Sequence, residues 1–477
     1  MALDGGRYLN FYLLAPRKRL GASLHARINY YYKNVLLQSQ QLTLSSEKTP
    51  SLTIVTDYTA SDDFSGLEVV PERPRLSILT NDNADGRHQI VIRHPGTTAS
   101  ARRSETFAPK DDAVRLTIRK LRKTLSDRAP TVKLRPAKAL VDDLKALAPI
   151  GWDLYSLLPG QVPPDFYGDL LATPENFVVQ VGRPETSSFV LPWACMYEIP
   201  LISDDKPTLC PMVEKWDGER PLFTGDLRQC PYGPHERNIL CPFGFWGYRY
   251  AIEQLSSSDK PVLSIRAALK CDVVVGETQY GVDLRKLDAH VSRLSQLLAT
   301  MPIKAQLQEG KDKEKIETLL GADLPFIYFY CHGERKNPAD PDTYLGVGQR
   351  EKITAQDLIG WTQTWYKRLK KVIWSAVRPL VFINACHVLA IEPETLVSYL
   401  QAFVSRGRAA GVIGTEVRVD QSLAMDVAEQ FIAAWMSGQK TVEEALRAVR
   451  LDYLRQGNML GLVYTPYCWS ELKLVGP

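Results

Sequence analysis

Apolar and polar residues alternate with a period of two along much of the first hundred residues, whereas the later chain carries unbroken apolar runs. The alternation, with the turn residues that interrupt it, predicts five short strands at residues 23–32, 35–44, 52–58, 75–79 and 89–93. Their even spacing is typical of a small antiparallel sandwich. We therefore expect an all-β, sandwich-like N-terminal domain over residues 1–108.

Helical periodicity begins after a polar linker at residues 99–109. Apolar side chains recur at helical spacing between residues 113 and 125, with arginine and lysine between them. The basic residues could bind an acidic partner or nucleic acid, but a solvated helix face is the simpler interpretation. With a second helical stretch at 137–158 and an insert rich in cysteine, proline and glycine, this region extends over residues 109–260.

Strand and helix alternate over residues 261–477. Apolar runs predict strands at residues 262–269, 272–275, 303–307, 325–331, 380–383 and 411–415. Helical stretches between them lie at residues 284–298, 316–320, 355–377 and 394–406. This alternation predicts an α/β fold with a mostly parallel sheet and helices on both faces.

Two of these strands end near residues that are suited to nucleophilic catalysis. Cys386 comes shortly after the strand at 380–383, and His332 and Gly333 follow the strand at 325–331. The carboxyl ends of neighbouring parallel strands meet at one edge of a sheet, where catalytic groups collect. We expect His332 to act as the base for a Cys386 nucleophile. The amides of Gly333 and Cys386 could together form an oxyanion hole.

Other polar residues near this edge could contribute to substrate specificity. Glu416 and Asp420 follow the strand at 411–415, and buried carboxylates there would bind a basic substrate residue ahead of the cleaved bond. A surface ion pair near Arg418 is the alternative. Cys331 should be buried, because an extended strand points it to the opposite face from His332.

Several motifs in this half of the chain occur in an order that resembles the CHAT family, whose members are caspase-like cysteine proteases of the separase and clostripain clan. The resemblance covers roughly residues 136–477. It rests on residues 330–334 (Tyr-Cys-His-Gly-Glu), 384–386 (Asn-Ala-Cys), 411–415 (Gly-Val-Ile-Gly-Thr) and 467–476 (Tyr-Cys-Trp-Ser-Glu-Leu-Lys-Leu-Val-Gly). It implies a caspase-like fold with a histidine–cysteine dyad at His332 and Cys386.

The resemblance also implies a function, a cysteine endopeptidase that cleaves a protein substrate through an acyl-enzyme. It suggests a role in bacterial antiviral defence or cell death. No repeat period is visible that would supply a built-in activator, so we expect activation by a protein partner or ligand. The alternative is a catalytically silent CHAT-like scaffold that binds other proteins.

Composition and charge indicate the compartment and the class of partner that we expect for this protein. The chain has 477 residues, of which 45% are hydrophobic and 23% are charged, as in ordinary soluble proteins. Residues 1–6 carry no secretion signal and no apolar run is long enough to cross a membrane, which predicts a cytoplasmic protein. The 58 basic and 54 acidic residues nearly balance, which argues against a dedicated nucleic-acid binder.

The cysteines leave one question open. Eight cysteines in a chain of this length suit reduced thiols better than a disulfide framework. Cys210, Cys230, His235 and Cys241 could bind zinc, but their spacing matches no compact zinc motif. A proline follows each of these cysteines, which favours loops packed on sulfur and aromatic rings. We therefore expect no metal or other cofactor.

Overall fold

The computed structural model describes residues 23–45, 51–82, 88–93, 104–128, 136–157, 177–184, 190–202, 206–267, 270–277, 283–335, 343–370, 372–385, 398–417 and 419–476. Among these residues, no helix has both the length and the apolar character needed to cross a membrane.

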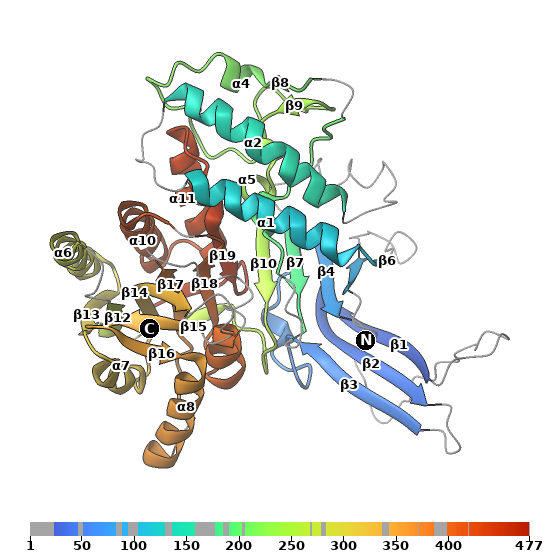
Figure 1. Cartoon of the computed structure of the whole chain (residues 1–477). Helices are drawn as coiled ribbons and strands as arrows, with labels where there is room; N and C mark the ends of the chain where they lie inside the picture. The colour runs from blue at the N-terminus through green and yellow to red at the C-terminus, as the bar shows by residue number, and fades with distance from the viewer. Residues whose placement is uncertain are drawn as a thin grey trace.

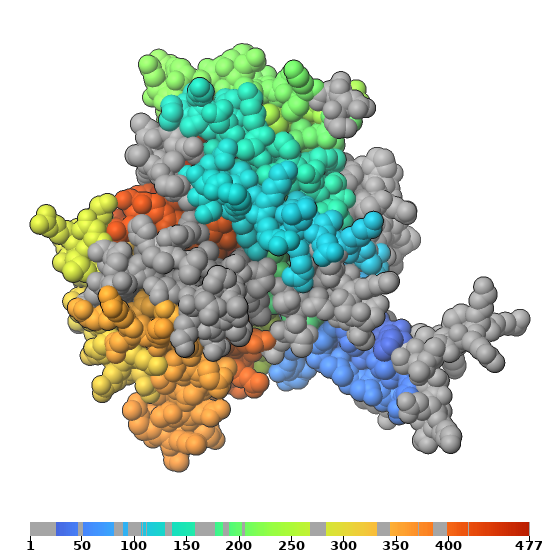
Figure 2. Space-filling view, viewed as in Figure 1, coloured from blue at the N-terminus to red at the C-terminus, as the bar shows by residue number. Residues whose placement is uncertain are grey.

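The N-terminal part of the chain is all-β, as predicted, and each of the five expected segments is a strand. One antiparallel sheet consists of β1 (Ser23–Tyr32), β2 (Val35–Ser45) and β3 (Ser51–Thr59). Strands β4 (Arg75–Asp82), β5 (His88–Arg93) and β6 (Ser104–Phe107) pair antiparallel in a second sheet. The first sheet projects from the rest of the molecule, as the blue surface in Figure 2 shows.

The second sheet also contains strands from much later in the chain. β7 (Val178–Gly182) pairs parallel with β4, and β10 (Ala251–Leu255) pairs parallel with β7. The strand order is therefore β10-β7-β4-β5-β6. This sheet joins strands from both sides of residue 108, where we expect the N-terminal domain to end.

Two long helices lie next to each other beside this sheet, α1 (Asp111–Arg128) and α2 (Ala137–Ser156) (Figure 1). In α1, the apolar stripe of Val114, Ile118, Leu121 and Leu125 is buried. Most of the basic residues of this helix are exposed, which confirms the solvated face expected from the sequence.

The insert consists of short elements, which are η3 (Trp193–Cys195), β8 (Thr208–Leu209), α4 (Pro211–Glu214), β9 (Ile239–Leu240), η4 (Pro242–Gly244) and α5 (Trp246–Arg249). Of these, α4, β8 and β9 are drawn in green at the top of Figure 1. Many of their aromatic residues are buried, including Trp193 and Trp246, whose rings stack at a centroid separation of 6.3 Å. The insert is therefore packed into the main core and is not a separate lobe.

The C-terminal half contains the predicted α/β sheet. Its strand order is β13-β12-β14-β17-β18-β19, with a hairpin of β15 (Thr343–Val347) and β16 (Glu351–Thr354) beside β14. The five parallel strands are β12 (Lys270–Glu277), β13 (Lys304–Gly310), β14 (Phe326–Arg335), β17 (Leu380–Ala385) and β18 (Gly411–Thr415). Only β19 (Tyr464–Tyr467) of this order runs antiparallel to its neighbour.

Helices cover both faces of this sheet, which confirms the predicted architecture. Alternate residues of β14 and β17 pack into two different cores. One core contains side chains of α6 (Leu284–Thr300) and α10 (Gln421–Met436), and the other contains side chains of α7 (Lys313–Leu320) and α8 (Ala355–Leu369). Helix α8 is shorter than expected, because it ends at Leu369 and Lys370 adopts a left-handed conformation with φ of 53°.

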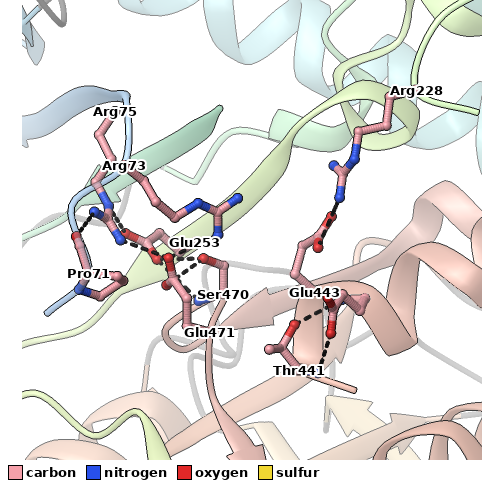
Figure 3. A network of polar contacts seen from close by, with 10 residues as sticks. Pro71, Arg73, Arg75, Arg228, Glu253, Thr441, Glu443, Ser470 and Glu471 are labelled. Atoms are coloured by element: carbon pink, nitrogen blue, oxygen red, sulfur yellow. Dashed lines mark hydrogen bonds and ion pairs between the residues drawn. The ribbon is translucent and has the colours of Figure 1, made fainter. Parts of the chain in front are cut away.

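The end of the chain returns to the N-terminal half through α11 (Val442–Arg455), η6 (Leu460–Val463) and β20 (Lys473–Val475), which pairs with β11 (Ser264–Arg266). Buried ion pairs reinforce this return (Figure 3). Arg75 of β4 is fully buried and contacts Glu253 of β10 at 3.3 Å and Glu471 at 2.9 Å. Ser470 donates its backbone N–H and its hydroxyl to Glu253. Arg75, Glu253 and Glu471 come from three distant segments of the chain and form one cluster of ion pairs.

Candidate active site

Of the expected catalytic residues, His332 and Gly333 belong to β14, whose parallel neighbour β17 ends one residue before Cys386. Their register pairs Phe326 with Leu380 at one end and Cys331 with Ala385 at the other. The backbone of β14 continues through His332 and Gly333, which pair with β15. Cys386 comes directly after Ala385 in sequence and lies outside the described residues. The structure thus places the two strand ends at one edge of the sheet.

Cys331 is buried, as expected. It has no exposed surface and belongs to the core that also contains Phe329 and Leu345. Its neighbour Tyr330 belongs to the opposite core, so the strand is extended at this point. Cys331 therefore lies on the face of the sheet that packs against α7 and α8, where it is shielded from solvent.

A buried polar network lies beneath the strand ends, and the sequence analysis missed it. The Asn384 side chain donates to the Tyr328 hydroxyl at 3.1 Å and to the Ala424 carbonyl at 2.7 Å. The Tyr464 hydroxyl donates to the Asn384 side-chain oxygen at 3.1 Å. The sequence signal was an asparagine in an otherwise apolar strand, two residues before Cys386. This network holds the carboxyl end of β17 against β14, β19 and α10.

A histidine extends the network toward the surface. The ring of His290, on α6, lies 3.2 Å from the Tyr328 hydroxyl and 2.6 Å from the Glu429 carboxylate. Burial tends to raise the pKa of Glu429, but hydrogen bonds from His290 and Arg293 outweigh it and lower that pKa below its ordinary value. These residues border a surface hollow of about 470 Å³ between α6 and α10, whose lining includes Arg285, Lys286 and Asp426.

The structure places the two proposed specificity carboxylates in different surroundings. Glu416 is 2% exposed, accepts a hydrogen bond from the Thr465 hydroxyl at 2.8 Å and lies 3.4 Å from Arg122 of α1. Asp420 is partly exposed and caps the N-terminus of α10 by accepting the Ser422 backbone N–H at 2.8 Å. The Glu416 charge therefore already has a cationic partner, whereas the Asp420 carboxylate is engaged in helix capping.

The four possible metal ligands of the insert lie far from this edge in sequence, but they come together in space. One ligand atom from each of Cys210, Cys230, His235 and Cys241 lies within 4.8 Å of all the others. Loops packed on sulfur were the favoured interpretation of the sequence, and the structure groups the sulfur atoms with the imidazole instead. The four side chains form the only such cluster of three or more histidine, cysteine, aspartate or glutamate ligands among the described residues.

Comparison with known proteins finds a family match in the C-terminal half of the chain. Residues 246–477 match the model of a family described as the CHAT domain. Over 94% of its length, the chain is 28% identical to a probable protease of Vitiosangium sp. (strain GDMCC 1.1324), and it spans 61% of that relative. Similarity to a protein named as a protease thus covers nearly the whole chain, whereas the family match covers the part that carries the C-terminal sheet.

Solved structures provide more distant likenesses. Separase in the Saccharomyces cerevisiae separase–securin complex matches 84% of this chain and 30% of its own, with 10% identity and a TM-score of 0.46. A secreted C11 cysteine protease from Bacteroides thetaiotaomicron, in complex with an irreversible peptide inhibitor, matches 35% of this chain and 54% of its own. Its identity is 12% and its TM-score is 0.23.

Proposed function

Because residues 246–477 form a CHAT domain, we propose that this protein is a cysteine endopeptidase in which Cys386 is the nucleophile and His332 is the base. The observation that carries the proposal is the register of β14 and β17, which ends with Cys331 beside Ala385. The next residues of the two strands are His332 and Cys386. Because side chains alternate along a strand, we expect His332 and Cys386 to lie on the face that carries Tyr328 and Asn384.

The proposed reaction uses His332 and Cys386 both when the thioester forms and when it is hydrolysed. His332 removes the proton of the Cys386 thiol, and the thiolate attacks the peptide carbonyl carbon. The amides of Gly333 and Cys386 stabilise the negative oxygen that forms. His332 then returns the proton to the departing amine, which leaves a thioester. Water, deprotonated by His332, hydrolyses the thioester and releases the carboxylic acid and the free thiol.

The buried environment of other cysteines supports this choice of nucleophile. Burial raises the pKa of the Cys195 and Cys468 thiols well above the ordinary value, so both remain protonated and react slowly. Cys331 has no exposed surface. A small thiol-directed reagent can therefore separate Cys386 from these three cysteines.

Labelling by an iodoacetamide probe tests the dyad. We expect modification of Cys386 in the native full chain, lost in His332→Ala and retained in Cys331→Ala. His387→Ala is the matched control, because His387 neighbours Cys386 in sequence but has no role in the proposal. Cys386→Ala should lower peptide cleavage by at least about 10³-fold. Labelling that is indifferent to His332, with no cleavage of any peptide, would favour the scaffold alternative.

The proposal includes substrate recognition and control. A basic substrate side chain that binds Glu416 would have to displace Arg122, which also donates to the Val190 carbonyl at 3.0 Å. We therefore expect the free enzyme to be restrained by α1 and released when a partner or ligand moves that helix. Asp420 would assist recognition from the start of α10. The biological setting, antiviral defence or cell death, rests on the family resemblance alone.

Variants of α1 test this control. Arg122→Ala should raise basal cleavage of substrates with arginine or lysine before the scissile bond, because it frees the Glu416 carboxylate. Arg119→Ala is the matched control, since Arg119 is exposed on the same helix. Glu416→Gln should abolish the preference for a basic residue. A preference for aspartate, unchanged in Glu416→Gln, would contradict this assignment.

A further inference from the structure

The cysteine and histidine cluster of the insert has the composition of a structural zinc site. Three thiols and one imidazole are a ligand set that Zn²⁺ commonly takes with tetrahedral geometry. With Zn–S distances of about 2.3 Å, the sulfur atoms of such a site lie roughly 3.8 Å apart. The ligand atoms of Cys210, Cys230, His235 and Cys241 lie within 4.8 Å of one another. A small contraction would complete the geometry.

Secondary structure places two of these ligands side by side. β8 and β9 pair parallel, with Leu209 beside Leu240. Cys210 and Cys241 are the next residues of the two strands, and the Cys210 backbone N–H donates to the Leu240 carbonyl at 3.1 Å. These two ligands are therefore fixed by the backbone before any metal binds.

A tight turn brings in the other two ligands. Four residues separate Cys230 from His235. Within this segment, the Gly233 backbone N–H donates to the Cys230 carbonyl at 3.0 Å. The Nε2 atom of His235 is buried and has no hydrogen-bond partner among the described residues. A buried ring nitrogen without a partner is costly, and a metal ion would satisfy it.

The sulfur atoms also have the surroundings of a metal site. The three cysteines are at most 8% exposed, and all three are free thiols. Closely spaced reduced thiols in a buried site are the donors that zinc prefers.

We propose that Cys210, Cys230, His235 and Cys241 bind one Zn²⁺ ion. With four protein ligands the ion has no open position for water or substrate, so its role is structural. This role is independent of the proposed protease activity. The sequence spacing hid the site because its ligands occur singly and are joined by pairing of two-residue strands.

The position of the cluster indicates what the ion would hold. The loop between Cys210 and Cys230 reaches α11 of the CHAT domain, where the Leu222 N–H donates to the Arg455 carbonyl at 2.8 Å. Arg228 lies 3.0 Å from Glu443 at the start of α11 (Figure 3). The metal would close the base of this loop and keep its tip on the helix.

Metal analysis of the full chain is the direct test. We expect about one zinc per chain in purified protein and a loss of affinity of at least about 100-fold in His235→Ala, measured against a competing chelator. His235→Cys should restore binding, because thiolate is also a zinc ligand. Cys468→Ser is the matched control, a buried cysteine outside the cluster. Protein without bound metal, or equal zinc affinity in wild type and His235→Ala, would overturn the proposal.

Thiol titration separates zinc from the competing possibility of a disulfide within the cluster. We expect eight titratable thiols in the denatured, metal-free chain. Six would indicate a disulfide and contradict the site. Zinc removal should also make the loop at residues 217–229 sensitive to trypsin after Arg228, whose side chain is held by Glu443 in the folded loop. Bound zinc with an unchanged digestion pattern after its removal would refute the structural role.

Discussion

The five-stranded sheet and the sheet that carries the candidate site differ in how their strands come together. In the C-terminal sheet, β12, β13 and β14 follow one another with a single helix between each pair. In the five-stranded sheet, β4 pairs with β7 from residue 178 and β7 pairs with β10 from residue 251. The paired strands of the first arrangement are therefore close together in the chain, whereas β4, β7 and β10 of the second are far apart.

The two sheets also differ in what their central strands bury. Aromatic and branched residues dominate β14 and β17, whereas the five-stranded sheet buries Arg75, Gln180 and Glu253. Gln180 accepts the Leu36 N–H at 2.8 Å and so joins this sheet to β2. Buried polar groups penalise wrong pairings, because a misaligned strand leaves them without partners. We infer that charge specifies the distant pairings and apolar matching specifies the local ones.

The largest effect should come from breaking the charge cluster of the five-stranded sheet. Arg75→Met would leave the buried Glu253 without its cation and Glu471 with Arg73 alone, and it should lower the free energy of unfolding by about 3–5 kcal/mol. Urea unfolding measures this loss. Arg73→Ala, which removes a more exposed contact to Glu471, should cost no more than about 1 kcal/mol. Equal losses would mean that burial of the charge is not what matters.

A somewhat smaller effect is expected from the polar network of the site sheet. Asn384→Ala leaves the Tyr464 hydroxyl and the Ala424 carbonyl without a partner, and we expect a loss of about 2–3 kcal/mol. Tyr464→Phe removes one hydrogen bond and should cost about 1 kcal/mol. Thermal unfolding of both variants would reveal the difference. A neutral Asn384→Ala would show that this sheet needs no buried polar group.

The pH dependence of stability should distinguish the two sheets further. Burial raises the pKa of Glu253 to about 7, with Glu471 raising it further and Arg75 opposing the rise. The folded protein therefore holds a proton that the unfolded chain loses near pH 4.5, so stability should fall as pH rises from 4.5 to 7. We expect a loss of roughly 2–3 kcal/mol across this window.

Glu253→Gln is the control for this pH effect, because the amide does not titrate. The pKa of Glu471 lies below its ordinary value, so that group contributes only under more acidic conditions. Stability of Glu253→Gln, followed by unfolding midpoints in buffers between pH 4.5 and 7, should therefore change less. A slope as steep as that of the wild type would place the titrating group elsewhere.

The smallest effect is expected on the projecting sheet of β1, β2 and β3. Ile54 is 54% exposed on β3, so Ile54→Thr should change the free energy of unfolding by less than about 0.5 kcal/mol. Leu36, which is fully buried on β2, is the matched contrast, and Leu36→Ala should cost about 2–5 kcal/mol. Similar losses for both would show that Ile54 is covered in solution.

Periodicity predicted the elements of this protein better than it predicted their partners. The strands β14, β17 and β18 lie where apolar runs indicated them, because burial on both faces leaves a strong local signal. Pairing of β4 with β7 left no such signal, since it depends on Gln180 and Arg75 meeting groups far away in the chain. The pattern of apolar residues shows which segments are buried, but it does not show which strand lies beside each of them.

The same limit applied to the sites. His332 and Gly333 lie within β14, which extends beyond the predicted end of that strand, but the contact between His332 and Cys386 stays a prediction. The role of Asn384 could not be read from the sequence, because its partners come from β14, β19 and α10. The cysteine cluster was underestimated for a similar reason, since two-residue strands are too short to show a period.

The contacts of Arg75 affect the order in which this protein can form during synthesis. Its partners Glu253 and Glu471 lie 178 and 396 residues further along the chain. At about 5–20 residues per second, a ribosome needs roughly 20 to 80 s to travel from Arg75 to Glu471. Throughout that time the guanidinium lacks at least one of its two carboxylate partners. The N-terminal strands are thus synthesised first but complete their packing last. We expect proteases to cleave at β4 in a nascent chain that is stalled before Glu471.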